Sequence, residues 1–457
     1  MIFSKDELSE IFNQTAESVN DICVNSNDAK IGDLFVALKG KKTDGHNFIE
    51  QAIDNGAVLA ISEKNIPGID ARKIILVESS EYALLQLAKY NIAKSPHTKY
   101  VGVTGSVGKT TTKDLIFHIL SNQRNMQNQV YVSRKNFNSQ IGLPICAATM
   151  PRNTKFGIFE MGMSNSGDIK KLIDILQPSI SIISQICETH MESFNSVWDI
   201  ARAKSEIFET KNPQEAVIIP QDSPYTDFLR QRAMESGIKN IFTFGSKNSD
   251  ARIIEYNYVN SHWEVIAEIF GEKIAYHIRG NNNSLIYNSL SSIFGANIIS
   301  GIAPQKLADQ VCSFDSSSGR GAIIYLKNKD IILIDDAYNA CPTSMRSAIQ
   351  SISKYKDRRK ILVLGDMLAL GKDTVFYHEN LSATIDKFGI DIVFTCGSLA
   401  KRLFNNLRDC KKGAWCENSA QLAEKVLEEI QNGDCVLVKG SNSMKMNHVV
   451  DVIKNLD

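Results

Sequence analysis

Short apolar runs alternate with amphipathic helical patterns along the chain, and the pattern of alternation changes near residue 98 and again near residue 316. In the first 97 residues, strands are predicted at 32–38, 57–61 and 74–77, and helices at 47–55 and 82–93. The next residues, 94–98, are polar and contain a proline, as is typical of a linker. We therefore expect a small N-terminal α/β domain over residues 1–97.

A regular alternation of strands and helices follows from residue 98 to about 315, which is typical of a parallel sheet with crossover helices. Three of its apolar runs are Tyr100–Thr104, Phe156–Phe159 and Ile180–Ile186. Polar residues follow each run, and open parallel sheets bind ligands beyond the carboxyl ends of their strands. We therefore expect Lys109, Glu160 and His190 to meet in one crevice. Alternating apolar and polar residues over 242–279 predict antiparallel hairpins attached to this domain.

A second alternating pattern begins near residue 316 and predicts a doubly wound, Rossmann-like C-terminal domain over 316–457. Its strands are predicted at Ile331–Ile334, Ile361–Leu364, Ile392–Thr395 and Val436–Val438. The serine- and glycine-rich stretch Ser316–Gly321 is predicted to be a hinge. The expected fold class is thus α/β with three domains, the central one, over 98–315, being a phosphate-loop ATPase domain.

Length and composition agree with this organisation and exclude several function classes. The 457 residues fit three domains of about 150 residues each. Lys plus Arg and Asp plus Glu both total 51, so the net charge is zero and does not favour a nucleic-acid partner. No secretory signal is present, and no stretch approaches the roughly 20 apolar residues of a membrane helix. The nine cysteines form no Cys-x-x-Cys pair. These features predict a cytoplasmic protein with reduced thiols and no membrane insertion.

The strongest local signal is YVGVTGSVGKTTTKDLI, residues 100–116, in which a β-branched run passes into two glycines, a lysine and threonines. In such loops, backbone N–H groups surround phosphates at a helix N-terminus, the lysine reaches the β- and γ-phosphates, and the next hydroxyl ligates Mg²⁺. The usual loop has four residues between its glycines, whereas this one is the shorter T-G-x-x-G-K-T-T, with Val103 at the first glycine position. We predict that ATP is bound by Gly105, Ser106, Val107, Gly108, Lys109, Thr110 and Thr111.

Glu160, His190 and Lys204 are weaker candidates when they are judged from the residues alone. Glu160 follows an apolar strand, where a carboxylate could hold Mg²⁺, but a salt-bridged strand end has the same pattern. A single histidine is more often structural, and a lysine in a helical segment such as that around Lys204 is more often exposed. Both interpretations of each residue stay open at this level.

Six motifs then occur in the order and spacing of the Mur ligase family: TGSVGKTT, FEMGMSNSGDI, HMESFNSVWDIARAKSEIF, LIDDAYNACPTSMRSAI, GDMLALG and VLVKGSNSMKM. Residues 32–57 add to the match, so the resemblance covers nearly the whole chain. The run DDAYNACPTSM, residues 335–345, resembles the members that add D-alanyl-D-alanine to UDP-N-acetylmuramoyl-tripeptide. Members that add the third peptide residue usually carry D-Y-A-H-x-P there.

The resemblance implies an ATP-dependent amide ligase of peptidoglycan precursor synthesis. ATP would phosphorylate the free carboxylate of the UDP-linked tripeptide, and the amine of D-alanyl-D-alanine would attack the acyl phosphate. The expected catalytic residues are Lys109, Lys204 and His190. Two Mg²⁺ ions are expected, with Thr110, Glu160, His190 and Lys204 as ligands. Lys204 matches the family lysine that CO₂ carbamylates, which turns a cation into an anion able to support a metal site.

The same resemblance implies nucleotide contacts outside the phosphate loop. Arg320 is expected toward the phosphates and Asp335 toward the ribose. Asn283, Asn288 and Asn339 are expected near the nucleotide. Further candidates, which would face the substrates or support the cleft, are Lys439, Ser441 and Asp366.

Three recognition elements depart from the family pattern. The uridine-side element, often D-[ST]-R, is here Val24–Asp28, without an arginine. The adenine-side motif, usually G-x-H-N-x-x-N, is the longer GNNNSLIYN at 280–288, without the histidine. The usual N-A-N-P is Asn339–Pro342, with Cys341 in place of the second asparagine. Because the residues for phosphoryl transfer are intact, we predict an active enzyme.

Several alternatives share part of this pattern. A sister Mur ligase or a folylpolyglutamate-synthase-like ligase would use the same ATP chemistry, and the run at 335–339 disfavours both. A non-catalytic nucleotide-binding scaffold is expected to have lost Lys109, Glu160 or Lys204, and all three are present. The family implies a monomer. The division of the site residues by the hinge predicts that the C-terminal domain closes on the central domain.

Overall fold

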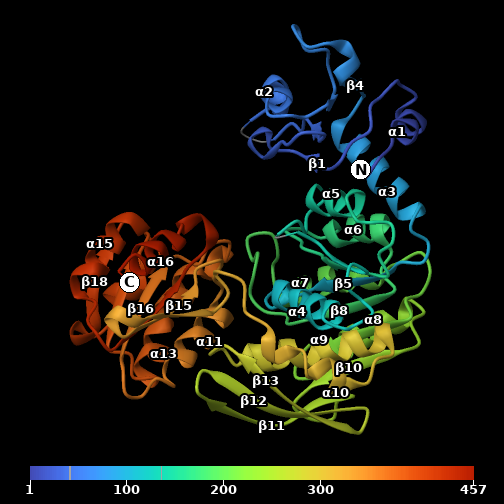
Figure 1. Ribbon diagram of the computed structural model, residues 1–457. Coiled ribbons are helices and arrows are strands. Elements are labelled where there is room, and N and C mark those ends of the chain that lie inside the picture. Colours follow the sequence, from blue (N-terminus) through green and yellow to red (C-terminus); the bar gives the residue numbers. More distant parts are fainter. Residues whose placement is uncertain (41–42, 135, 457) are drawn as a thin grey trace.

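The computed structural model describes residues 1–40, 43–134 and 136–456, so Lys41 and Lys42 of the matched stretch 32–57 lie outside the described residues. Three separate sheets, each with its own helices, follow one another along the chain (Figure 1). The predicted α/β class is confirmed. The N-terminal sheet stands above the central one, and the C-terminal sheet lies beside the central one (Figure 1).

The N-terminal sheet has four parallel strands in the order β1-β2-β3-β4. They are β1 (Ile22–Cys23), β2 (Leu34–Val36), β3 (Leu59–Ser62) and β4 (Ile74–Leu76), and the helices are α1 (Lys5–Phe12), α2 (Ile49–Asp54) and α3 (Ser80–Ala93). The three predicted strands are therefore present, although each is shorter than its predicted run. Asn91 on α3 joins this unit to the central one, because its amide donates to the carbonyls of Ala147 (2.9 Å) and Met150 (2.8 Å).

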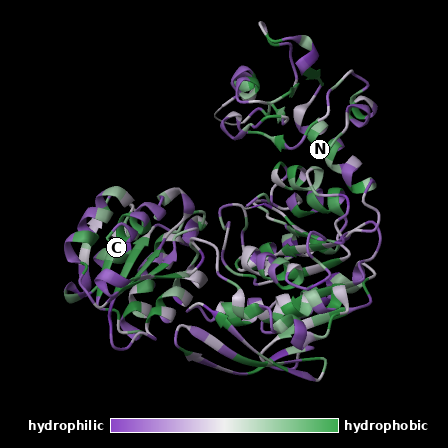
Figure 2. Ribbon diagram, viewed as in Figure 1, coloured by the Kyte–Doolittle hydropathy of each residue, from purple (hydrophilic) through white to green (hydrophobic). Residues whose placement is uncertain are grey.

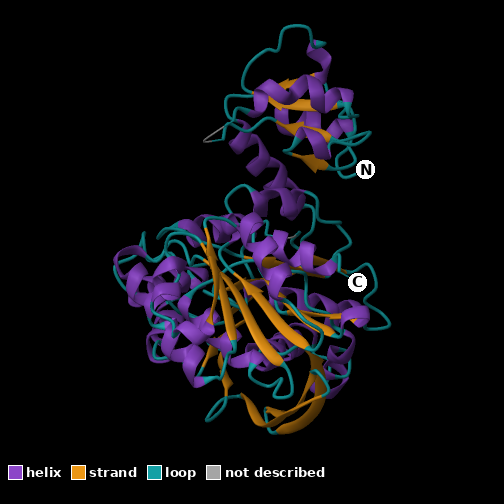
Figure 3. Cartoon of the chain, turned by 90° about the vertical axis from the view of Figure 1, so that its left-hand side faces the viewer, coloured by secondary structure: helices purple, strands orange, loops and turns teal. Residues whose placement is uncertain are grey.

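The central sheet has nine strands in the order β13-β12-β11-β10-β9-β8-β5-β7-β6. In Figure 3 the C-terminal unit faces the viewer, and the N-terminal unit stands above the rest of the chain. The strands of the central sheet are β5 (Lys99–Thr104), β6 (Val130–Val132), β7 (Phe156–Glu160), β8 (Ile180–Ile183), β9 (Ala216–Pro220), β10 (Ile241–Gly245), β11 (Ala251–Val259), β12 (His262–Ile269) and β13 (Glu272–Arg279). Its helices are α4 (Lys109–Ser121), α5 (Gly142–Ala148), α6 (Asp168–Leu176), α7 (Val197–Ser205), α8 (Thr226–Glu235), α9 (Ser284–Ser300) and α10 (Pro304–Ala308).

Two details of the central sheet differ from the prediction. Only β11, β12 and β13 are antiparallel to one another, whereas β10 pairs in parallel with β9 and with β11, so the predicted hairpin region begins one strand later. The run Ile180–Ile186 was expected to be one strand, but β8 ends at Ile183. Beyond it, the carbonyl of Gln185 accepts a hydrogen bond from the backbone of Ser106, so the chain leaves the sheet to support the phosphate loop.

The C-terminal sheet has six strands in the order β14-β15-β19-β16-β17-β18, parallel except at the β14 edge. They are β14 (Ala322–Leu326), β15 (Ile331–Asp336), β16 (Arg359–Gly365), β17 (Ile392–Cys396), β18 (Lys412–Cys416) and β19 (Asp434–Lys439). Its helices are α11 (Pro342–Ile352), α12 (Thr374–Glu379), α13 (Leu381–Lys387), α14 (Ala400–Asn405), α15 (Ser419–Glu429) and α16 (Asn447–Lys454).

The strands that carry candidate residues are buried on both faces, because helices cover both sides of the parallel sheets. β7 and β19 are buried at every position, and β15 at every position but its last. Figure 2 shows the corresponding hydrophobic strands inside each unit, with hydrophilic residues on the outer helix faces. Rigid strands therefore fix the backbone positions from which the candidate side chains project. Among the described helices, none has the length and apolar character to cross a membrane.

Candidate functional site

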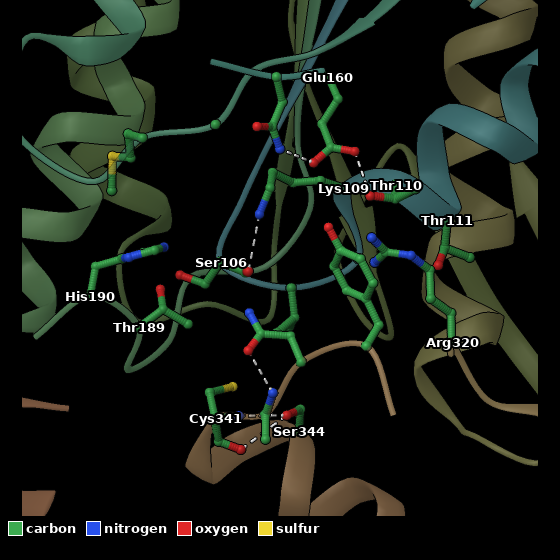
Figure 4. Close-up of a pocket in the computed structure, with 18 of the residues that line it drawn as sticks. Ser106, Lys109, Thr110, Thr111, Glu160, Thr189, His190, Arg320, Cys341 and Ser344 are labelled. Carbon is green, nitrogen blue, oxygen red and sulfur yellow. Dashed lines mark hydrogen bonds between the residues drawn. The ribbon is translucent and has the colours of Figure 1, made fainter. Parts of the chain in front are cut away.

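A cavity of about 730 Å³ opens beyond the carboxyl ends of β5 and β7, between the central and C-terminal units. This volume lies within the range of ligand pockets. The central wall includes Ser106–Thr111, Glu160, His190, Lys204 and Asn288, and the opposite wall includes Gly319, Arg320, Asp336, Tyr338–Cys341, Ser344 and Lys439 (Figure 4). The structure thus brings Lys109, Glu160 and His190 to one crevice, as the strand pattern predicted.

The phosphate loop connects β5 to α4 by a turn that only glycine fits well. Gly105 has φ +151°, and a Cβ there would lie 2.0 Å from the Ser184 hydroxyl oxygen. Gly108 has φ +89° and is the N-cap of α4, so the first backbone N–H groups of the helix lie beside it. Lys109 Nζ donates to the carbonyls of Gly105 (2.9 Å) and Ser106 (3.2 Å). The loop therefore presents a cation and a helix N-terminus at the cavity, which suits a phosphate group.

Glu160, at the end of β7, is the buried carboxylate of the site, with 2% of its surface exposed. The hydroxyl of Thr110 donates to its Oε2, and the amide of Asn138 donates to its Oε1 at 2.7 Å. The sequence did not single out Asn138, since an isolated asparagine in a loop carries no distinctive pattern. Together, the two carboxylate oxygens and the threonine hydroxyl form a set of hard oxygen donors of the kind that Mg²⁺ prefers.

Lys109, Lys204 and His190 share this cavity, and their mutual repulsion adds to the effect of burial. Burial lowers the pKa of Lys109, and burial together with the charge of Lys109 lowers the pKa of Lys204 well below its usual value. Burial and the two lysines lower the pKa of His190 to about 4. Lys204 is only 2% exposed and lies in the cavity wall, so it is not the exposed helix lysine that its sequence context favours. The arrangement favours neutral nitrogen groups or a bound anion.

The C-terminal wall adds two further cations. Arg320 lies in the hinge, with its guanidinium 3.9 Å from the ring centre of Tyr338. Lys439, at the end of β19, donates to Asp336 Oδ2 at 2.7 Å and to the carbonyl of Asn339 at 2.9 Å. Arg320, Asn339 and Lys439 therefore line the cavity, as does Asp336, which the sequence did not single out.

Asp335, Asp366 and Ser441 do not line the cavity in this structure. Asp335 Oδ2 accepts from the hydroxyl of Ser318 (2.9 Å) and the backbone N–H of Gly319 (2.8 Å), so the carboxylate braces the hinge from behind. Asp366 Oδ1 accepts from the backbone N–H of Ala400 at 2.6 Å. The hydroxyl of Ser441 accepts from the backbone N–H of Leu368 at 2.9 Å. Their contacts here are structural, and the predicted ribose contact of Asp335 stays a prediction.

The altered adenine-side motif reaches the cavity and also contacts the C-terminal unit. Asn282 and Asn288 line the cavity, whereas Asn283 does not. Four hydrogen bonds join the asparagine triplet to the segment of α11 and the residues just beyond it. Asn281 Nδ2 donates to Ser351 Oγ (3.0 Å), Ser347 Oγ donates to Asn282 Oδ1 (2.8 Å), and Lys354 Nζ donates to Asn283 Oδ1 (2.8 Å) and to the Asn281 carbonyl. The motif is therefore part of the contact between the two units.

The uridine-side element Val24–Asp28 forms a short turn, in which the side chain of Asn25 accepts from the backbone N–H of Asn27. An arginine does lie near this element, but the central unit supplies it: Arg134 Nη2 is 3.0 Å from Asp21 Oδ2. No sequence pattern links Arg134 to this place, because the two segments are more than a hundred residues apart.

Comparison with known proteins gives consistent matches along the chain. Family models match residues 18–89 (Mur ligase family, catalytic domain), 103–296 (Mur ligase middle domain) and 319–442 (Mur ligase, glutamate ligase domain). The chain is 33% identical over 443 residues, 94% of each chain, to a UDP-N-acetylmuramoyl-tripeptide–D-alanyl-D-alanine ligase of Rickettsia prowazekii. It is 33% identical over 431 residues to the Bacillus subtilis ligase of the same name, covering 92% of this chain and 90% of that one.

Among solved structures, the MurF ligase from Thermotoga maritima in complex with ADP matches with a TM-score of 0.81 and 27% identity. The match covers 96% of this chain and 97% of that one. The likeness therefore includes all three sheets rather than one shared domain.

Proposed function

The chain belongs to the Mur ligase family, and we propose that it joins D-alanyl-D-alanine to UDP-N-acetylmuramoyl-tripeptide at the expense of ATP. The product is UDP-N-acetylmuramoyl-pentapeptide, a peptidoglycan precursor. The observation that carries the proposal is the run at 335–345, which lies at the cavity opposite the phosphate loop and matches the D-alanyl-D-alanine-adding members. The names of the two relatives, which match over nine-tenths of the chain or more, support the same substrate.

The reaction has two steps, and the residues of this chain position and neutralise the charged groups in both. The tripeptide carboxylate attacks the γ-phosphorus of ATP, which gives an acyl phosphate and ADP. The amine of D-alanyl-D-alanine then attacks the acyl carbon, and phosphate leaves. Lys109 and the N-terminus of α4 hold the β- and γ-phosphates, and Arg320 approaches them from the hinge. Positioning and charge neutralisation supply most of the rate enhancement in such phosphoryl transfers.

Two Mg²⁺ sites fit the donor groups of the cavity. Thr110 and Glu160 would hold one ion, since their oxygens already converge. His190 would contribute to the other, because burial lowers its pKa and so favours the unprotonated imidazole, which is able to bind a cation. Bound Mg²⁺ supplies charge neutralisation on the phosphate oxygens.

Lys204 fits the second site only as a carbamate. An ammonium group would repel Mg²⁺, but the lowered pKa favours the neutral amine, which is the form that reacts with CO₂. The amine attacks the carbon of CO₂ and loses a proton, so that an N-carboxylate replaces the cation. Its new negative charge would also offset Lys109, whose charge is one cause of the lowered pKa of Lys204.

We further propose that Asn283, Asn288 and Asn339 contact the nucleotide, with Asp335 reaching the ribose after a rearrangement of the hinge. We also propose domain borders at 97/98 and 315/316, and the starts of β5 at Lys99 and of β14 at Ala322 support them. A monomer suffices for activity, because one chain supplies both walls of the cavity.

The substrates of the proposed reaction place it in the cytoplasm. Closure of the C-terminal domain would exclude water from the acyl phosphate.

The test is phosphate release by the purified protein with Mg²⁺-ATP and UDP-N-acetylmuramoyl-tripeptide, with and without D-alanyl-D-alanine. We expect release that requires all three substrates, with the pentapeptide identified by mass spectrometry. Tripeptides with meso-diaminopimelate and with lysine are both offered, because the sequence does not distinguish them. A sister ligase would instead use the dipeptide with a diamino acid, or folate with glutamate. A scaffold would bind ATP without turnover on any substrate, which would overturn the proposal.

A further inference from the structure

Two buried thiols meet where the central and C-terminal units join. Cys187 follows β8, and Cys341 immediately precedes α11, yet their sulfur atoms are 3.9 Å apart. The two residues are only 5% and 3% exposed. All nine cysteines lie within the described part of the chain and are free. A disulfide bond is about 2.0 Å long, so the sulfur atoms need to approach by about 1.9 Å to bond.

Each thiol is anchored to a functional segment on its own side. The backbone N–H of Cys187 donates to the hydroxyl of Ser106 (3.1 Å), and that hydroxyl donates back to the Cys187 carbonyl (2.9 Å), so Cys187 braces the phosphate loop. On the other side, the sulfur of Cys341 accepts from the backbone N–H of Ser344 in the first turn of α11. The two segments already touch, because the hydroxyl of Thr343 donates to Glu188 at 2.8 Å.

Cys341 is the reactive member of the pair. It lies in the wall of the nucleotide cavity, so a small oxidant that enters the cavity reaches it (Figure 4). The hydrogen bond from Cys187, and those from Ser344 at the helix N-terminus, lower the pKa of the Cys341 thiol. The hydrogen bond with Cys341 and burial raise the pKa of Cys187. Cys341 is therefore the thiol that an oxidant in the cavity meets first, and Cys187 lies behind it.

We propose that Cys187 and Cys341 are a modification site, at which a hydroperoxide forms a reversible disulfide that inactivates the enzyme. The Cys341 thiolate attacks one peroxide oxygen, the O–O bond breaks, and the released hydroxide takes up a proton as water. The Cys187 sulfur then attacks the sulfenic acid of Cys341, the S–O bond breaks, and a second water leaves. For hydrogen peroxide, two thiols and one peroxide give one disulfide and two waters, with two electrons passing from sulfur to oxygen. A small thiol reductant restores both cysteines by exchange.

The expected effect of the disulfide on activity follows from the hydrogen bonds that tie Cys187 to the phosphate loop and Cys341 to the start of α11. The disulfide ties the support of the phosphate loop to the start of α11, and the approach of the sulfur atoms moves one or both segments. The predicted domain closure and the binding of ATP phosphates both depend on these segments. This part of the inference rests on the proposed function, whereas formation of the disulfide does not. Bound ATP fills the cavity and is expected to slow the oxidation.

The disulfide can be read directly from peptides. Trypsin cuts after Lys171, Arg202, Lys329 and Arg346, so Cys187 and Cys341 fall in separate peptides, 172–202 and 330–346. After treatment of the full-length protein with hydrogen peroxide, we expect these peptides joined, with a mass two hydrogens below their sum. Mg²⁺-ATP should slow the joining severalfold. Cys187→Ala should abolish it, and Cys146→Ala, which removes a buried cysteine elsewhere, should leave it unchanged.

The rate measurement completes the test. Oxidised wild type is expected to release phosphate at least tenfold more slowly than the reduced protein, with recovery in dithiothreitol. Cys341→Ala lacks the thiol that peroxide attacks, so, compared with its own reduced form, it should not show the recoverable loss. Recovery of the two peptides unjoined, with Cys341 as sulfinic acid, would overturn the proposal, as would a joined peptide with an unchanged rate. If no substrate supports turnover, the peptides still decide whether the disulfide forms, and binding of a fluorescent ATP analogue replaces the rate.

Discussion

The buried ion pair between Lys439 and Asp336 allows a quantitative test of the structure. The two residues face each other on the paired strands β19 and β15, 2.7 Å apart, with side chains 3% and 16% exposed. Lys439→Met keeps the aliphatic length and removes the charge. It leaves Asp336 buried without its counter-ion, which is among the most destabilising changes that a single substitution makes.

The loss of stability is limited by whichever of two responses has the lower free-energy cost: an ionised Asp336 without its counter-ion, or a protonated Asp336. Losing the attraction of a unit charge at 2.7 Å costs about 6 kcal/mol at an effective dielectric constant of about 20. Protonating Asp336 at pH 7 instead costs about 4 kcal/mol, which is roughly 3 units above the ordinary aspartate pKa at 1.36 kcal/mol each. Protonation has the lower free-energy cost, so it limits the electrostatic contribution to the loss of stability. The lost hydrogen bond to the Asn339 carbonyl adds about 1 kcal/mol, which gives about 4–5 kcal/mol in total.

This argument also predicts a pH dependence. Burial already raises the pKa of Asp336, and Lys439 opposes that effect. Without Lys439 the pKa rises further, so the folded variant holds a neutral carboxyl where the unfolded chain holds an ionised one. A raised carboxyl pKa gives stability that is present at low pH and is lost as the pH rises. The deficit of Lys439→Met should therefore grow by about 1.4 kcal/mol per pH unit, from about 2 kcal/mol at pH 5 to about 4–5 kcal/mol at pH 7.

Amide hydrogen exchange of the full-length protein, corrected for intrinsic rates, measures this deficit in β15 and β19. At pH 7 we expect protection to fall by about a thousandfold, the equivalent of about 4 kcal/mol. Lys439→Met combined with Asp336→Asn should recover most of it, because no charge is left buried. Lys425→Met is the matched control, since Lys425 and Glu428 are 51% and 64% exposed, and it should change protection less than threefold. A deficit below tenfold, or an equal deficit at pH 5 and pH 7, would refute the reasoning.

Three further substitutions test the nucleotide side. Gly105→Ala places a methyl group 2.0 Å from Ser184 Oγ, so ATP affinity should fall more than about tenfold. Gly68→Ala, also at a positive φ (+87°) but with open space around it, should keep ATP affinity. Isothermal titration with an ATP analogue measures both affinities. Arg320→Met should raise the KM for ATP about tenfold or more, through loss of a charged phosphate contact, and an unchanged KM in the phosphate-release assay would place Arg320 outside the nucleotide site. Lys204→Ala should lower kcat about a hundredfold or more, and short carboxylic acids should restore part of it; near-normal turnover would contradict the carbamate.

The sequence predicted best those elements whose signal is local and strong. Long apolar runs such as β5, β7 and β16 are buried parallel strands and were placed within a few residues. Five strands, β1, β6, β9, β14 and β18, were not predicted, and β9 was missed although it is a buried apolar run. β6 (VYV) is only three residues long, and β18 (KGAWC) has no continuous apolar run, whereas β14 (AIIYL) is an apolar run that was not singled out from the sequence. In β18, pairing with β17 rather than composition makes the segment a strand.

The site residues also divide into those with a local sequence signal and those without one. The phosphate loop is contiguous, so its glycines, lysine and threonines could be predicted from one stretch. The sequence could not predict which of Asp335 and Asp336 faces the cavity. Successive residues of a strand face opposite sides, and no pattern indicates which side is the cavity. Asp335 braces the hinge, and Asp336 lines the cavity beside Lys439. Asn138 and Arg134 act through contacts with distant segments, and no local pattern indicates such contacts.

Two of the three departures from the family pattern lie on the same inter-domain contact, that of α11 with the central unit. The asparagine triplet at 281–283 bonds to Ser347, Ser351 and Lys354 along this segment, and Cys341 contacts Cys187 at its start. Lys354 also lies 3.7 Å from the ring centre of Trp263, so a cation and an aromatic ring close the far end of the contact. A ligand that displaces the adenine-side loop must therefore break bonds to α11, and α11 cannot move without shifting Cys341. The adenine-side motif, the position of the C-terminal unit and the thiol pair are thus linked through one helix, whereas the side-chain hydrogen bonds described for Lys109, Thr110 and Glu160 lie within the central unit.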